Sequence, residues 1–262
     1  MQKKRVTTTR DKVIRSAEIV LACVFWIIVW HGAAEITDME LLLPTPERTA
    51  QRLFELMGTE AFFRNVFTSL GNIALGFVTG ALAGTALGIL TALSEHFNRL
   101  TLPVGKIIKT TPVASFIILA LVWIKADNVP SFVSFLMVTP IVWDSLRTAI
   151  RSADTDLLEA AAAYRLGFCG TLKAVYIPSC INIYMTSLRT SMSLAWKAGI
   201  AAEVLCTPKH SIGTSLYESK VYMETADLFA WTLTVIVISV ILEMLITKGF
   251  GLIMKKRSGT NG

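Results

Sequence analysis

The feature that most limits how this chain can fold is the gathering of its apolar residues into long blocks. Of its 262 residues, 53% are hydrophobic and only 17% are charged, whereas about a quarter of a soluble domain is charged. The apolar residues continue for about 20 positions at a time instead of recurring at the spacing of an amphipathic helix. We therefore expect an all-α, polytopic bundle of membrane helices.

Six segments have the length and composition of membrane helices. They cover residues 16–34, 65–93, 107–124, 131–150, 181–205 and 228–254. Trp26 and Trp30, near the end of the first segment, suit the interfacial zone of a bilayer. A cleaved secretory signal peptide is the alternative for this first segment, because a basic tail precedes it.

The connectors between these spans are expected to be short and polar. The first contains Thr45 and Pro46, which predict the start of an interfacial helix. We expect a polar turn at 94–106, a tight connector at 125–130 and a polar connector at 206–227. Pro112 is expected to kink the third span within its first turns.

Four glycines recur at intervals of four residues in the second span. They are Gly76, Gly80, Gly84 and Gly88. Residues four apart share one stripe of a helix, and glycine there lets a second backbone come close, as in membrane helix pairs. We expect the stripe to pack tightly against another helix, and a direct role in substrate contact is the alternative.

One polar segment, residues 154–178, lies between the fourth and fifth spans. It begins with acidic residues, which a helix dipole favours at that end, and contains a run of four alanines that favours helix. Gly167 and Gly170 are expected to let the chain turn, and Pro178 suits the first turn of the next helix. Such a segment beside the membrane offers a docking surface.

The basic residues predict the orientation of the bundle. With six spans, both termini and the polar segment lie on one side, which holds 17 Lys and Arg residues against six on the other. An excess of positive charge marks the cytoplasmic side. We therefore expect a multi-pass protein of the cell (inner or plasma) membrane with cytoplasmic termini. This bias explains the net charge of +6, so nucleic acid is not an expected partner.

Two basic residues, Arg189 and Lys197, fall inside the fifth span, where an unpaired charge is costly. At about 100° per residue, Arg189, Ser193 and Lys197 share a helix face, and Trp196 is expected beside them. This face is a candidate translocation path that attracts an anion. For Arg189 the alternative is a position near the membrane surface or a carboxylate partner; for Lys197 both interpretations are open.

The polar segment also contains the run Glu159-Ala160-Ala161, with Pro178 nineteen residues after the glutamate. This pattern resembles the EAA loop of ABC importer permeases, the membrane subunits of ATP-driven import systems. The resemblance implies that a short coupling helix here inserts into a groove on a cytoplasmic ATPase. The docking residues that it implies are Glu159, Ala160, Ala161, Tyr164, Arg165, Leu166, Gly167 and Phe168.

The chain departs from the family pattern at one position of this loop. The family glycine usually lies six residues after the glutamate, where this chain has Arg165, and the nearest glycine is Gly167. The departure concerns the local turn, because the overall spacing of the loop is kept.

Two further stretches resemble the sulfonate, nitrate and taurine branch of the same family. They are the helix start at Thr45 and the stretch 193–203, in which the family position of Lys197 is usually apolar. The resemblance implies the transmembrane domain of a type I ABC importer and import of a small oxyanion such as a sulfonate, taurine or nitrate. Relatives that carry thiamine-precursor pyrimidines or riboflavin leave a second substrate class open.

The resemblance implies further members of the complex. These are ABC ATPase subunits, a second permease copy, expected as a homodimer, and an extracytoplasmic solute-binding protein. ATP and Mg²⁺ are expected on the ATPase and no cofactor on this chain, which lacks a phosphate-binding loop motif. The expected parts of the chain are as follows: residues 1–60, a tail with the first span and the interfacial helix; 61–254, the transmembrane domain with a coupling loop at 151–179; and 255–262, a basic tail.

Other functional classes find less support. His31, His96 and His210 are far apart in the sequence, and the four cysteines lack the spacing of a metal site. A non-catalytic permease is therefore expected rather than a membrane enzyme. An ion-driven secondary transporter is the alternative of another class, although the two halves show no convincing repeat. Glu203 and Glu243 are interpreted as interfacial or paired carboxylates.

Overall fold

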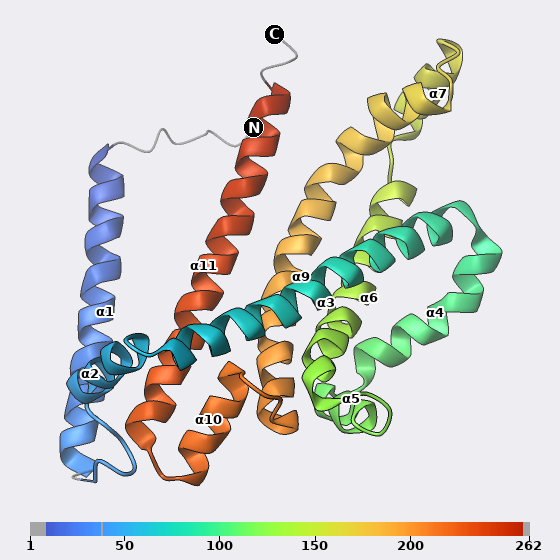
Figure 1. Ribbon diagram of the computed structural model, residues 1–262. Coiled ribbons are helices and arrows are strands. Elements are labelled where there is room, and N and C mark those ends of the chain that lie inside the picture. Colours follow the sequence, from blue (N-terminus) through green and yellow to red (C-terminus); the bar gives the residue numbers. More distant parts are fainter. Residues whose placement is uncertain (1–8, 38, 259–262) are drawn as a thin grey trace.

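The computed structural model describes residues 9–37 and 39–258, and every regular element in those two ranges is a helix (Figure 1). Side chains are described for residues 17–37, 39–167 and 169–249. The side chains of the two basic tails and of Phe168 lie outside this description. The expected all-α class is confirmed.

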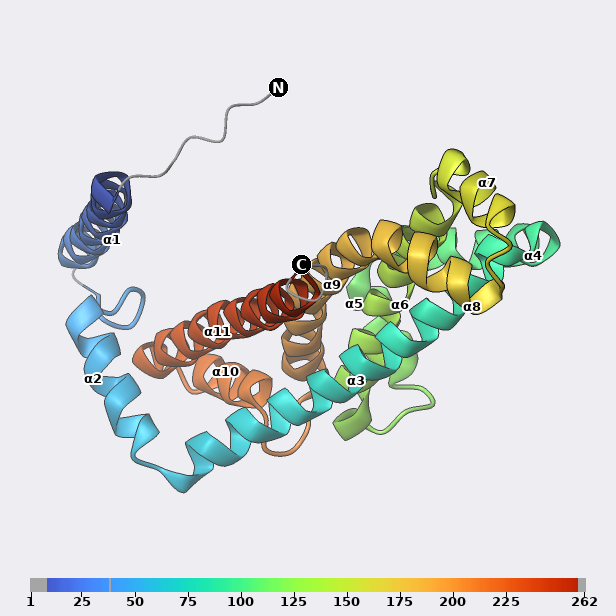
Figure 2. The same cartoon turned by 90° about the horizontal axis from the view of Figure 1, so that it is seen from above.

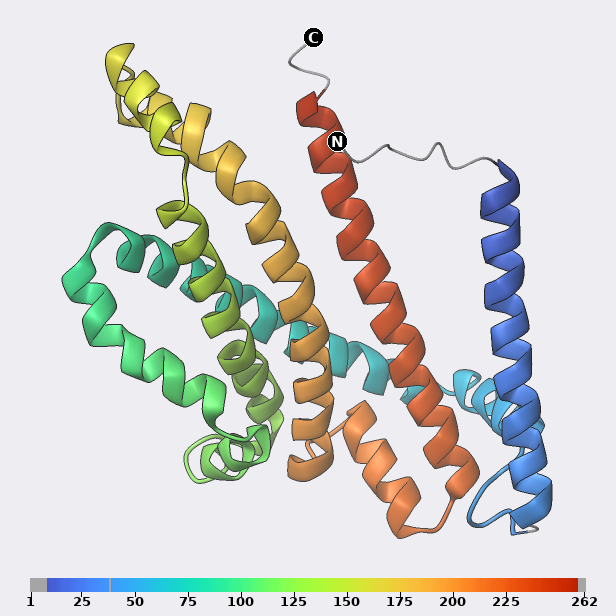
Figure 3. The same cartoon turned by 180° about the vertical axis from the view of Figure 1, so that it is seen from behind.

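Four long helices form the body of the molecule: α3 (Glu60–Leu93), α6 (Val129–Arg151), α9 (Ile177–Cys206) and α11 (Thr225–Ser258). Helices α6 and α9 run side by side, α3 crosses them at an angle, and α11 packs against α9 (Figures 1 and 3). One of the cores formed by their buried apolar side chains includes Ile73, Val138, Val142, Trp196 and Trp231.

The glycine stripe of α3 lies against α6. A Cβ atom placed on Gly76 would come within 2.2 Å of the Ser131 carbonyl oxygen, and one on Gly84 within 2.6 Å of the Thr139 carbonyl oxygen. A Cβ atom on Gly80 would come within 2.9 Å of the Phe135 carbonyl oxygen, and one on Gly88 within 3.0 Å of the Trp143 carbonyl oxygen. Only a residue without a side chain fits at these distances, so the two backbones are in direct contact.

Helix α1 (Thr9–Thr37) stands at the edge of the bundle, beside α2 (Pro46–Met57) (Figure 2). Most of its apolar side chains are exposed; Trp26, for example, is 67% exposed. Near its C-terminal end, Trp30 donates from Nε1 to the Pro44 carbonyl oxygen at 3.1 Å, and its ring stacks on Phe229 of α11. The helix is thus joined to the rest of the molecule at one end.

The expected start of the interfacial helix is confirmed. Thr45 precedes α2, and its side-chain oxygen accepts a hydrogen bond from the Arg48 backbone N–H at 3.3 Å. Pro46 occupies the first turn, where its missing N–H costs nothing. Likewise, Pro178 lies in the first turn of α9.

The expected polar turn at 94–106 is wrong, because a helix, α4 (Glu95–Thr110), occupies it. Ser94 begins this helix, and its side-chain oxygen accepts from the Phe97 backbone N–H at 3.3 Å. Charged residues alternate here with leucine, isoleucine and valine, so α4 is amphipathic rather than irregular.

The single span expected at 107–124 is also wrong. Pro112 breaks it, and the short helix α5 (Val113–Ala120) follows α4 at an angle of 101°. Proline disfavours helical geometry in the residue before it, and Thr111 is accordingly extended, with a ψ of 131°. A 3₁₀ turn, η1 (Ala126–Asn128), then leads into α6.

The polar connector expected at 206–227 contains another helix, α10 (Ile212–Val221), which is a further correction. Ser211 caps it by accepting a hydrogen bond from the Thr214 backbone N–H at 3.1 Å. Helices α2, α5 and α10 lie toward one end of the bundle, and the short helices after α6 lie at the other (Figures 1 and 3).

The sequence predicts about six spans, and the structure gives fewer by length and composition. Within the described residues, four helices are long and apolar enough to cross a membrane, and the number rises to five if the bent pair of α4 and α5 is counted as one span. Helix α9 is 30 residues long but does not meet the criterion. Polar residues spread along it lower its mean hydropathy.

Candidate functional site

A short helix, α7 (Thr155–Ala163), projects from the end of the bundle where α6 stops (Figure 1). Asp154 begins it, and its side chain accepts a hydrogen bond from the Asp156 backbone N–H at 2.9 Å. The alanine run then continues the helix to Ala163. Helix α8 (Phe168–Thr171) and a π-helical turn, η2 (Leu172–Tyr176), lead from α7 into α9.

The chain turns between α7 and α8 at Arg165, not at Gly167 or Gly170 as the sequence suggests. Arg165 has a φ of 51°, in the left-handed region, and among the described residues no glycine has a positive φ. Its backbone N–H donates to the Ala162 carbonyl oxygen at 2.9 Å, and that of Leu166 donates to the Ala161 carbonyl oxygen at 3.0 Å. This pair of bonds defines a Schellman motif.

The Schellman motif accounts for the departure from the family pattern. Its left-handed position normally takes glycine, because any side chain there strains the backbone. The resemblance implies a family glycine at the position of Arg165, and this chain makes its left-handed turn there with arginine. The turn therefore carries some backbone strain.

Most of the expected docking residues form an exposed surface on this turn. Glu159, Ala160, Arg165 and Gly167 are exposed, and the Tyr164 side chain is 82% exposed. Ala161 instead points into the protein, with only 4% of its surface exposed. It therefore supports the turn from within rather than contributing to the surface.

An apolar groove of about 560 Å³ separates the turn from the bundle. Leu166, Thr171, Leu172 and Tyr176 line it from the turn and η2, and residues from the ends of α3, α6 and α9 complete the lining: Ile89, Leu93, Leu146, Ile150, Ile177 and Cys180. The α7–α8 turn therefore joins the bundle chiefly through its covalent ends, with a groove rather than a filled core beneath it.

The four residues expected on one face of α9 have different surroundings in the structure. Arg189 pairs with Glu243 of α11 through both Nε, at 3.2 Å, and Nη2. Trp196 is buried in the core, and its Nε1 donates to the Val235 carbonyl oxygen at 3.2 Å. Both side chains thus bind α11, and the expected position of Trp196 beside an open face is wrong.

The other two residues of that set, Ser193 and Lys197, lie about 40° and about 80° around α9 from Arg189. Lys197 is exposed and Ser193 is partly buried. Thr186 and Thr190 precede Lys197 at helical spacing, so these side chains share a stripe. Thr186 and Thr190 also line a groove of about 380 Å³ between α6 and α9, with Ile141, Ser145, Asn182, Ile183 and Ser187.

Two groups of polar residues make contacts whose partners the sequence does not predict, although Glu203 was expected to be interfacial or paired. Near the end of α9, the buried Glu203 accepts hydrogen bonds through Oε2 from Ser69 Oγ at 2.8 Å and from the Gly213 backbone N–H at 3.0 Å. In α6, Asp144 pairs with Lys109 of α4 at 2.7 Å. An acidic residue inside an apolar span is the signal that could have drawn attention to Asp144.

Comparisons with known proteins agree with this architecture. A family model for the binding-protein-dependent transport system inner membrane component matches residues 84–258. The putative aliphatic sulfonates transport permease protein SsuC of Bacillus subtilis (strain 168) is 23% identical over 212 residues, which cover 80% of this chain and 75% of SsuC. The bicarbonate transport system permease protein CmpB of Synechococcus elongatus is 26% identical over 203 residues, which cover 75% of this chain and 73% of CmpB.

A solved structure shares the fold. The crystal structure of an amino acid ABC transporter with histidines superposes with a TM-score of 0.62 and covers 78% of this chain and 97% of the other. Its sequence is 16% identical, so the likeness concerns the arrangement of the helices alone.

Proposed function

The chain belongs to the family of binding-protein-dependent transport system inner membrane components, and we propose that it conducts a small oxyanion across the membrane for an ATP-driven importer. Membership makes it a multi-pass, non-catalytic protein of the inner membrane with the transmembrane fold of a type I ABC importer. An ABC ATPase and a solute-binding protein are its partners, and the ATPase binds the ATP.

The proposed cargo is a small oxyanion such as a sulfonate, taurine, nitrate or bicarbonate. Support comes from the relatives, one named for aliphatic sulfonates and one for bicarbonate. Each of these anions carries its charge on a few oxygen atoms, so one kind of cationic site suits them all. The four polar side chains Thr186, Ser187, Thr190 and Asn182 beside α6 are suited to hydrogen-bond such groups.

The exposed turn between α7 and α8 is the proposed ATPase-docking surface. The observation that carries this proposal is the projection of α7 beyond the bundle (Figure 1), together with the exposure of Tyr164 and Arg165 in the turn that follows it. The end of the bundle that bears the turn is proposed to face the cytoplasm, together with both termini. Two copies of the chain, as a homodimer, would present one turn to each ATPase subunit.

Coupling follows from how the turn continues into α9. Helix η2 ends at Tyr176, and α9 begins at the next residue, so no flexible loop separates the turn from a long helix. A push on the turn is therefore passed to the bundle as a movement of α9. ATP changes the balance of conformations only because the ATPase binds one arrangement of the two turns more tightly than the other.

The docking proposal is tested by truncating the exposed side chain of Tyr164. Tyr164→Ala is expected to lower co-purification of the cognate ATPase, and ATP-dependent uptake of labelled taurine or nitrate, by about tenfold or more, as for other interface anchors. Tyr222→Ala is the matched control, because Tyr222 is 72% exposed at the opposite end of the bundle. Full uptake and ATPase binding in the Tyr164 variant would contradict the proposal.

The proposed orientation has a separate test. A Thr155→Cys variant in a background with Cys23 and Cys169 replaced by serine should react with an impermeant maleimide only in inverted membrane vesicles. Labelling in intact cells would place the turn on the outer side and overturn the docking proposal.

A further inference from the structure

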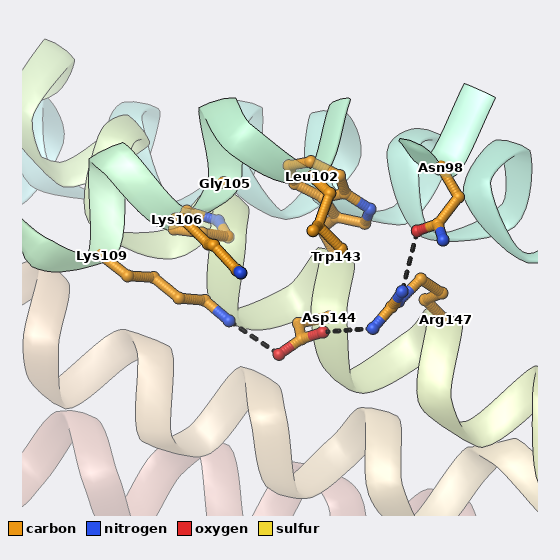
Figure 4. Close-up of a pocket in the computed structure, with 9 residues that line it drawn as sticks. Asn98, Leu102, Gly105, Lys106, Lys109, Trp143, Asp144 and Arg147 are labelled. Carbon is orange, nitrogen blue, oxygen red and sulfur yellow. Dashed lines mark hydrogen bonds and ion pairs between the residues drawn. The ribbon is translucent and has the colours of Figure 1, made fainter. Parts of the chain in front are cut away.

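A charged cavity of about 240 Å³ lies between α4 and α6 (Figure 4). Its lining consists of Asn98, Leu102, Gly105, Lys106, Lys109, Pro140, Trp143, Asp144 and Arg147. The sequence places Lys106 in the turn before the third span and Lys109 at the start of that span. In the structure both lysines belong to α4, which brings them beside α6.

Asp144 lies between two of the cavity's positively charged side chains, Lys109 and Arg147, and contacts both (Figure 4). Lys109 Nζ lies 2.7 Å from Oδ2, and Arg147 Nη2 lies 3.2 Å from Oδ1. Arg147 also donates from Nη1 to Asn98 Oδ1 at 2.8 Å. Asp144 thus holds a lysine and an arginine from two different helices in place.

The cavity carries more positive than negative charge. Lys106, Lys109 and Arg147 supply three positive charges, and Asp144 supplies one negative charge. In the described part of the chain, Lys106 forms neither an ion pair nor a side-chain hydrogen bond, and it lines the same cavity as the other three. A cavity lined mainly by one sign of charge attracts ions of the other sign.

The depth of this cavity argues against a lipid-facing surface. Asp144 lies seven residues before Arg151, the last residue of α6, or about 10 Å along the helix axis. Charged groups at such a depth face either a partner or water, because hydrocarbon does not solvate them. Asp144, Lys109 and Arg147 have partners, whereas Lys106 is exposed and has none among the described residues, so we infer that water reaches it.

We propose that the α4–α6 cavity is an anion-binding subsite of the translocation path, a proposal that rests on the proposed import function. Lys106 and Arg147 bind the oxyanion, and Asp144 positions Arg147 and Lys109 while partly neutralising them. That partial neutralisation keeps binding weak enough for release, which conduction requires. The volume of about 240 Å³ is below the range of about 300–1,000 Å³ of drug-sized ligand pockets and suits a small solute.

The α9 residues named from the sequence are a weaker candidate for this role. Glu243 neutralises Arg189, and Trp196 lies in the core. Lys197 alone remains as a positive charge on the exposed stripe of α9. The α4–α6 cavity instead combines an excess of positive charge with neighbouring hydrogen-bond donors.

The subsite is tested by the charge preference of a cysteine placed in it. A Leu102→Cys variant, with Cys23 and Cys169 replaced by serine, is purified in detergent. It is treated with a sulfonate-bearing and with a trimethylammonium-bearing methanethiosulfonate reagent. The sulfonate reagent is expected to react faster, and adding Lys106→Gln and Arg147→Gln should lower the rate ratio by about tenfold. Ethanesulfonate or nitrate should slow the sulfonate reagent.

The controls separate this proposal from its alternatives. Lys220→Gln, on α10 at the far end, should leave the rate ratio unchanged, and Lys106→Gln alone should lower it by about threefold if the double variant does not fold. A ratio within twofold of the parent in the Lys106 variant would overturn the subsite. Protection by phosphatidylglycerol but not by ethanesulfonate would overturn it in favour of a lipid headgroup site.

The proposed import function is tested independently of the subsite. The labelling assay needs neither ATPase nor transport, so a negative result here leaves the import test intact. Conversely, failure of ATP-dependent uptake would not alter the measured charge preference.

Discussion

Helices α1 and α6 are both apolar enough to cross a membrane, yet they sit in opposite surroundings. Within an apolar stretch of 18 residues in each span, 6% of the stretch in α1 is buried in the protein, against 61% of the stretch in α6. The hydrophobic effect does not separate them, because lipid and protein interior are equally apolar. The difference between them is close backbone contact. Helix α6 makes such contact with α3, and no described part of the chain makes it with α1.

The glycines of the two regions show the same contrast. A Cβ on Gly76, in the seam between α3 and α6, would lie 2.7 Å from the Ser134 Cβ, whereas around a Cβ on Gly32 of α1 nothing among the described atoms lies within 4 Å. Membrane helices associate through packing and hydrogen bonds, both of which require this closeness. Apolar composition therefore identifies a span, and small-residue spacing identifies its protein-facing side.

The largest effect is expected from filling the seam. Gly76→Leu should lower the free energy of unfolding by about 3 kcal/mol or prevent folding, because its side chain would overlap the α6 backbone. Thermal unfolding in detergent, followed by size-exclusion chromatography, measures the change. Gly32→Leu in α1 is the matched control, expected to cost less than about 0.5 kcal/mol. Equal effects of both variants would show that the contrast between the regions is wrong.

A medium effect is expected from a tryptophan in each region. Trp143 of α6 is buried, and its Nε1 donates to Thr91 Oγ1 of α3 at 2.8 Å. Trp143→Phe removes this bond and part of the packing, so we expect a loss of about 2 kcal/mol. Trp26→Phe, on the exposed side of α1, should change stability little. The same unfolding assay compares them, and a larger loss for Trp26 would reverse the argument.

The smallest effect concerns the link of the α1–α2 region to the bundle. Arg52 of α2 pairs with Asp227 of α11 and with Glu55, at 2.8 Å for the latter. The hydrogen bond from Arg52 lowers the pKa of Glu55 below its usual value of 4.5, and the bond to Asp227 raises the pKa of Arg52. A carboxyl group whose pKa is lowered in the folded state stabilises the fold at pH values above its ordinary pKa. This contribution is lost as the pH falls through the lowered pKa.

The test compares wild type with Glu55→Gln across pH. The melting temperature of the variant should be slightly lower at pH 6, and the difference should disappear well below pH 4.5, where Glu55 is protonated in both states. Glu60→Gln, in the first turn of α3, serves as the control carboxylate. A difference that grows on acidification would contradict the assigned sign.

The sequence predicted those features that depend on local spacing. The glycine stripe, the helix start at Thr45 and the helix start at Pro178 each follow from residues within one or two turns of helix. The amphipathic α4 was misread as a turn, because its charges outweighed its apolar stripe. Its packing on α6 depends on contacts such as Lys109 with Asp144, which are 35 residues apart in the chain.

The candidate site was predictable to the same limited extent. The EAA resemblance located the α7–α8 turn, but the burial of Ala161 and the left-handed Arg165 emerge only from how the turn closes on itself. Similarly, helical periodicity put Arg189 and Lys197 on one face, but it could not foresee that Glu243 of α11 would take Arg189. Pairing between distant helices decided both outcomes.

Helix α9 extends for 30 residues, or about 45 Å, and its last turns hold Glu203. A single oxygen of that carboxylate fastens α3, through Ser69, and α10, through the backbone of Gly213. Helix α9 thus begins directly after η2 at one end of the bundle, and its last turns bind α3 and α10 at the other. A tilt of α9 at one face would move the first turn of α10 at the other. One helix therefore connects movements at the two faces of the protein.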